Sequence, residues 1–149
     1  MGQQQLLLLV LGAIIVGLAI VVGINLFGQG AVKANEDAVR QDILSMMARA
    51  EEYYRKPVMM GGAGKVTLAN VSWANLGYRF HSNGDPIEGT EDYTNDNGSY
   101  HLTGTVNTAV IAGTCAENTD IIVTGTLTIN VATQVSTITV TSTLATGTD

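Results

Sequence analysis

The chain has 149 residues, which is room for one domain and an N-terminal apolar segment. Only 13% of the residues are charged, about half of what a soluble domain usually carries, and the net charge is −6. An acidic balance disfavours nucleic acid as a partner, the single Cys115 excludes an intramolecular disulfide, and the lack of a CxxCH motif excludes a haem-bearing filament.

The first predicted element is an apolar helix over Leu6–Phe27, which contains no charged residue and is long enough to cross a bilayer. Membrane anchors carry Lys or Arg on their cytoplasmic side, but Met1–Gln5 has none and the first cation is Lys33. Two interpretations follow: a basic leader has been removed so that Met1 is the first mature residue, or the segment is not primarily a membrane span. Small residues in this segment let helices approach closely, and they are Gly12, Gly17 and Gly23.

An amphipathic helix is predicted next, with a break or loosening allowed at Gly28–Gly30 and an end at Pro57. Gaps of three, four and seven place its apolar residues on one stripe: Val32, Val39, Ile43, Met46, Met47, Ala50, Tyr53 and Tyr54. The opposite face carries the charged residues Lys33, Glu36, Asp37, Arg40, Asp42, Arg49, Glu52 and Arg55. We expect the stripe to be core against a globular head.

The rest of the chain is predicted to be β-rich. Residues 65–80 indicate two short strands around Asn75, with Trp73, Tyr78 and Phe80 available to the core. An acidic loop rich in Asn, Asp, Gly and Thr is expected over residues 81–98.

Further strands are predicted over Tyr100–Val106, Ala109–Thr114, Asp120–Val131 and Val135–Leu144. The last two alternate apolar residues with Thr at period two and form a hairpin across residues 132–134. Ile121, Val123, Leu127, Ile129 and Val131 share one face of the first, and Ile138, Val140 and Leu144 share one face of the second. We expect that apolar face to cover the helix stripe and rows of Thr to face outward.

The first 57 residues resemble a processed bacterial type IV pilin: an uncharged half-helix, then an amphipathic half-helix that ends in Tyr53-Tyr54-Arg55-Lys56-Pro57. The resemblance implies an α+β fold in which a long N-terminal helix packs on an antiparallel sheet. It divides the chain into a hydrophobic helix (1–30), an amphipathic helix (31–57) and a β-rich head (58–149). Two features depart from the family, because Gln5 stands where a glutamate is usual and the distal cysteine pair is absent.

The function that the resemblance implies is a structural filament subunit, not an enzyme and with no cofactor. The implied partners are other copies of the chain, the inner membrane before assembly, a prepilin peptidase and the pilus assembly machinery, and the implied location is the cell surface. The residues expected to make assembly contacts are Met1, Gln5, Leu6, Leu11, Gly12, Gly17, Gly23 and Phe27. Alternatives left open are a minor pilin or secretion pseudopilin, an archaeal-type pilin, and a membrane-anchored binding module with a flexible linker after Phe27.

Other patterns give weaker hypotheses. Candidate glycosylation sites are Asn70 and Asn97, which match the N-linked sequon, and Thr137, Thr139 and Thr141. Asp92, Asp96 and Asn97 do not meet the spacing of a calcium loop, so a plain acidic turn is favoured. His81 and His101 are read as ordinary surface or core residues, and Cys115 as a small buried hydrophobe at a strand end.

Overall fold

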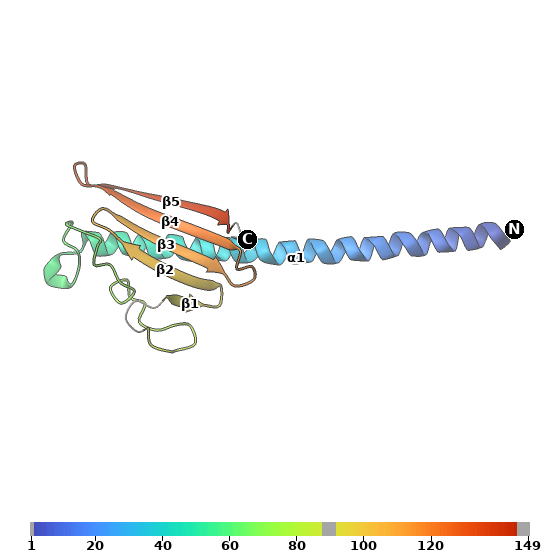
Figure 1. Cartoon of the computed structure of the whole chain (residues 1–149), viewed down its shortest axis with the longest axis horizontal. Coiled ribbons are helices and arrows are strands. Elements are labelled where there is room, and N and C mark those ends of the chain that lie inside the picture. Colours follow the sequence, from blue (N-terminus) through green and yellow to red (C-terminus); the bar gives the residue numbers. More distant parts are fainter. Residues whose placement is uncertain (1, 88–91, 146–149) are drawn as a thin grey trace. The chain divides into compact units, whose positions relative to one another are not determined.

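The computed structural model describes residues 2–87 and 92–145 and has an α+β fold (Figure 1). Its elements are α1 (Gly2–Arg55), a 3₁₀ turn η1 (Val58–Met60), β1 (Tyr93–Asn95), β2 (Gly98–Gly104), β3 (Thr108–Cys115), β4 (Ile121–Asn130) and β5 (Val135–Leu144). The chain forms two compact units, Met1–Ala34 and Asn35–Asp149. We call the second unit the head; it contains the sheet and the last 21 residues of α1.

The five strands form one antiparallel sheet in the order β1-β2-β3-β4-β5, so each strand pairs with its neighbour in sequence. β4 and β5 pair along their whole length, from Ile121 opposite Leu144 to Asn130 opposite Val135. Thr residues oppose each other on the outer face of this hairpin: Thr124 with Thr141, Thr126 with Thr139, and Thr128 with Thr137. The period-two alternation in the sequence therefore predicted both the hairpin and the Thr rows.

The core lies between the helix and the inner face of the sheet. The buried residues of α1 are Val39, Ile43, Met46, Met47, Ala50, Tyr53 and Tyr54, which confirms the predicted stripe from Val39 onward. The sheet contributes Tyr100, Ala109, Ile111, Cys115, Val123, Leu127 and Ile129. Two strand glycines lie under the helix: a Cβ on Gly113 would stand 2.8 Å from Val39 Cγ1, and one on Gly125 would overlap Ile43. Glycine at these sites lets the helix approach the sheet closely.

Residues 65–80 are not two strands, as the sequence suggested, but a series of turns. Trp73 and Leu76 are both buried, and residues three apart can share a face in a turn but not in a strand. The Tyr78 amide donates to the Trp73 carbonyl at 2.8 Å and closes the turn. Phe80, expected in the core, is 58% exposed and makes only an isolated bridge to Pro86.

Four further expectations need correction. α1 runs unbroken through Gly28 and Gly30, because glycine weakens a helix but keeps its amide donor. The predicted acidic loop 81–98 contains β1, and the β4–β5 turn begins at Val131, which is exposed and not part of the apolar face. Leu144 is 70% exposed at the end of β5, the edge strand of the sheet, and so is not part of the covered apolar face.

Candidate assembly interface

The first part of α1 presents apolar side chains on every side. Leu6, Leu11 and Phe27 are 64%, 52% and 82% exposed, and the most apolar stretch of the helix buries none of its residues. By length and composition the helix could cross a membrane. A helix that is apolar all round is stable only where lipid or protein surrounds it.

The glycines of this segment form two shallow faces. At about 100° of rotation per residue, Gly12, Gly23 and Gly30 fall within roughly 20° of one another, and Gly17 and Gly28 lie on a second face roughly 150° away. A Cβ added at any of the five would find open space within 4 Å. Each face lets a neighbouring helix approach the backbone closely.

The predicted assembly residues that the structure describes lie on α1: Gln5, Leu6, Leu11, Gly12, Gly17, Gly23 and Phe27. Met1 lies outside the described residues. A shallow apolar hollow near the start of the helix is lined by Gln3, Leu6, Leu7 and Val10, of which Leu6 belongs to the predicted set. Gln5 is exposed on the same turns.

Two residues on the polar face of the second part of α1, Asp42 and Arg49, make contacts with the rest of the head. One oxygen of Asp42, Oδ2, accepts three hydrogen bonds, from Tyr100 Oη at 2.7 Å, Asn97 Nδ2 at 2.8 Å and Asn95 Nδ2 at 2.9 Å. Burial, and then the bond to Asp42, raises the pKa of the Tyr100 hydroxyl well above its ordinary value, so Tyr100 remains a donor. Arg49 donates to the Leu76 carbonyl and lies 4.8 Å from the centre of the Tyr78 ring.

Further hydrogen bonds hold α1 against turns at both ends of the head. Asn35 donates to the Asn97 carbonyl at 3.0 Å and accepts from the Glu117 amide at 3.2 Å. At the other end, the Tyr54 hydroxyl donates to the Lys65 carbonyl at 2.9 Å. The sequence analysis did not predict that Asn35 and Asp42 bond to the rest of the head. For Asp42 the sequence held one signal, its position next to Ile43 at the border of the apolar stripe.

The candidate glycosylation sites differ in their surroundings. Asn70, Thr137, Thr139 and Thr141 are exposed. Asn97 is half-buried, and its side-chain amide nitrogen donates to Asp42. This nitrogen is the atom to which an N-linked sugar would be attached.

The two histidines and Cys115 make separate contacts in the part of the chain that the structure describes. His101 Nδ1 lies 2.7 Å from Asp92 Oδ1 on the exposed sheet surface, and His81 Nδ1 accepts from the Thr94 amide at 3.1 Å. Burial raises the pKa of the Cys115 thiol, with a smaller contribution from Glu36, so the residue packs as a hydrophobe at the end of β3. Within residues 2–87 and 92–145, no three His, Cys, Asp or Glu side chains come together as metal ligands.

Comparison of the chain with protein-family models, with curated proteins and with solved structures finds no match. The functional argument therefore depends on the chain's own geometry: an exposed apolar helix, and a sheet packed on the continuation of that helix.

Proposed function

We propose that this chain is the structural subunit of a type IV pilus-like filament, assembled by packing its N-terminal helices against those of other copies. The observation that carries the proposal is the exposed apolar surface of α1 over Leu6–Phe27. Contiguous apolar surface of this size marks a contact with lipid or with protein. Helix packing between copies would cover it after assembly, and a membrane would cover it before.

The two glycine faces support packing with more than one neighbour. A plain membrane span needs only lipid around it, whereas a helix in a bundle needs sites where other helices can come close. Faces roughly 150° apart would let one helix contact two others at the same time.

The continuity of α1 also favours the filament over a membrane-anchored binding module. The module requires a flexible linker after Phe27, but the helix continues through Gly28 and Gly30 to Arg55.

The test is to shear the cells that produce this chain and examine the released material by electron microscopy and mass spectrometry. We expect thin uniform fibres made mainly of this chain. Protein that stays in the membrane fraction without fibres would contradict the proposal and favour the anchored module. Fibres in which this chain is only a trace component would favour a minor pilin or pseudopilin.

A further inference from the structure

The head has two ends of different chemistry. We call one end the tip, formed by residues 56–68, 105–107 and 131–134. The Leu68 amide donates to the Val106 carbonyl at 3.1 Å, and the Ile129 amide donates to the Asn107 carbonyl at 2.8 Å. These bonds hold residues 56–68 and the β2–β3 turn beside the end of β4, where the β4–β5 turn begins.

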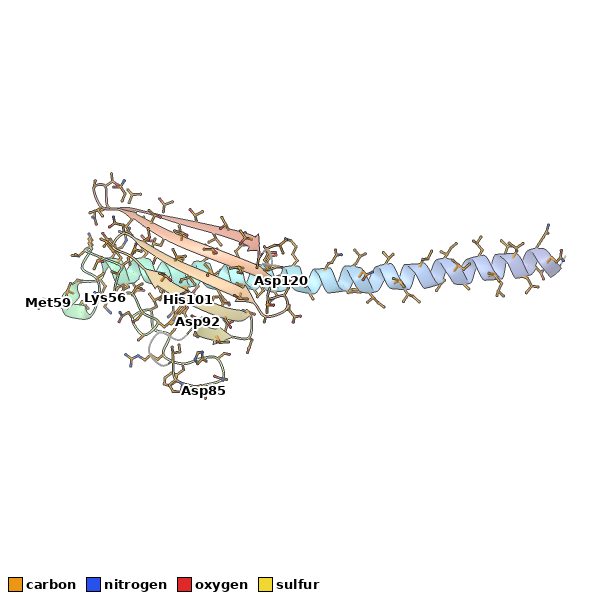
Figure 2. All side chains as sticks on the ribbon, in the orientation of Figure 1. Lys56, Met59, Asp85, Asp92, His101 and Asp120 are labelled. Atoms are coloured by element: carbon orange, nitrogen blue, oxygen red, sulfur yellow. The ribbon has the colours of Figure 1, made fainter. Side chains whose placement is uncertain are left out.

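We call the opposite end the base, formed by the turns at residues 95–98 and 116–120. The Ala116 amide donates to the Asn97 carbonyl at 2.9 Å, and Asn35 of α1 bonds to both turns. Figure 2 shows Lys56 and Met59 at the tip and Asp120 at the base.

The tip is basic and apolar. Its three segments carry Lys56 and Lys65 and contain no acidic residue. Met59 is fully exposed, and the other tip residues with large exposed apolar side chains are Val58, Met60, Val66, Val106 and Val131. A group of exposed apolar side chains bordered by polar or charged residues is typical of a surface that contacts another protein.

The base is acidic. Its two turns carry Asp96, Glu117 and Asp120 and contain no Lys or Arg. Leu144 lies at the same end, since it pairs with Ile121 at the start of β4 and is 70% exposed. The base therefore offers the opposite charge and an apolar side chain.

The two ends cannot neutralise each other within one copy. Twenty residues of α1 separate Asn35, at the base, from Arg55, next to Lys56 at the tip, and at about 1.5 Å per residue they span roughly 30 Å. Charges in physiological salt are screened over about 8 Å. At closer range, Glu51 near the tip already accepts from Arg55 at 2.7 Å and from Ser136 at 2.6 Å.

We propose that the tip of one copy docks on the base of the next, with Lys56 and Lys65 facing Glu117 and Asp120. The apolar residues around Met59 then cover Leu144. Such a contact joins two different surfaces, and repetition of a contact of this kind produces an open chain. The inference rests on the proposed filament and names the head surfaces that join its subunits.

Cysteine cross-linking of fibres tests the contact. In the full-length double variant Met59→Cys/Thr119→Cys, both positions are exposed, one at each end, while the native Cys115 is buried. Mild oxidation should give a ladder of covalent dimers, trimers and longer species on a non-reducing gel. The matched control Met59→Cys/Thr139→Cys, with its second thiol on exposed β5, should give no ladder.

Intact fibres that give no ladder, or as strong a ladder in the control, would overturn the docking. If the unmodified chain made no fibres at all, the filament proposal would fail and the docking with it. The two failures are therefore distinguishable.

Charge reversal gives a second measurement that needs no cysteine. Lys56→Glu/Lys65→Glu and Glu117→Lys/Asp120→Lys should each lower the fibre yield about fivefold, because attractive surface pairs become repulsive. The combination of all four changes should restore the yield, and Arg79→Glu, exposed outside both ends, should leave it unchanged. Thermal unfolding of each variant shows whether its head is folded, and folded variants whose combination is no better than either half would overturn the docking.

Discussion

The two parts of α1 share one continuous helix but differ in what surrounds their side chains. In residues 2–30 the large apolar side chains are exposed, and the glycines have open space beside them. In residues 35–55 the apolar stripe from Val39 to Tyr54 is buried in the head while Leu44, off the stripe, is 41% exposed, and the glycines at the close contacts are on the strands opposite. The first part thus needs surroundings that one chain does not supply, whereas the second is completed by its own head.

Under the filament proposal, the space for close helix packing comes from different places in the two parts of α1. Towards the sheet, Gly113 and Gly125 supply the space and the helix supplies bulky Val39, Ile43 and Met47. In the first part, the helix itself carries the glycines. A helix that must fit against copies of itself can obtain close approach only from its own sequence.

Of the substitutions considered, a charged residue in the first part of α1 should have the largest effect, because it should abolish fibre formation. Gly17→Glu places a carboxylate in the apolar segment, at a cost of about 3 kcal/mol in a membrane-like setting, and fills one glycine face. We expect electron microscopy of sheared material to show no fibres, while thermal unfolding of the head is unchanged. Thr139→Glu, which puts the same charge on exposed β5, should assemble normally.

Normal fibres from the Gly17→Glu variant would contradict the packing of helices through this segment. They would also remove the distinction between the two parts of α1, because a helix face that tolerates a buried charge has no close neighbour.

Removal of the carboxylate that receives three hydrogen bonds should have the next largest effect. Asp42→Ala leaves the donors of Tyr100, Asn95 and Asn97 without their shared acceptor, and we expect a loss of about 3 kcal/mol in the free energy of unfolding. Urea denaturation of the full chain in detergent, followed by the fluorescence of buried Trp73, measures it.

Asp37→Ala is the matched control, because Asp37 is exposed on the same helix and its loss should change stability by less than about 0.5 kcal/mol. Equal effects of the two substitutions would mean that the bonds to Asp42 add nothing to stability.

Substitution of glycine by alanine should have the smallest effect of the three changes. It distinguishes the strand glycines under the helix from the glycines in the first part of α1. In Gly113→Ala the new Cβ would stand 2.8 Å from Val39 Cγ1 and 3.0 Å from Ile43 Cδ1, so we expect the head to lose about 2 kcal/mol. In Gly12→Ala the methyl group meets open space, so the urea midpoint of the head should not move.

Under the filament proposal Gly12→Ala should instead lower the fibre yield. A Gly113→Ala head as stable as the original would show that the helix and the sheet are not in close contact at this point.

Local periodicity carried most of the prediction of the fold. The stripe from Val39 to Tyr54 repeats every three or four residues, and the alternation in β4 and β5 repeats every two. Each of these repeats places the apolar side chains on one face of its helix or strand, and this does not depend on what packs against that face. These elements could therefore be predicted from the sequence. Pro57 likewise predicted the end of α1, which the structure places at Arg55.

The elements that were predicted wrongly lack such a period. Residues 65–80 contain aromatic residues that favour strands, but Trp73 and Leu76 are drawn into the core from a turn. Of the candidate interface, the apolar segment and its glycines could be predicted, because exposure on all sides of a helix follows from composition. The tip and the base could not, since they bring together turns from distant parts of the chain.

The sequence by itself determined that an uncharged helix continues into an amphipathic one and that an antiparallel hairpin with Thr rows follows, because these features depend on neighbours along the chain. Only the tertiary structure decided that Asp42 receives three hydrogen bonds from residues more than 50 positions away. It also decided that two lysines gather with apolar side chains at one end of the head and three acids at the other. Contacts of this kind depend on how the turns meet in space, which no local pattern records.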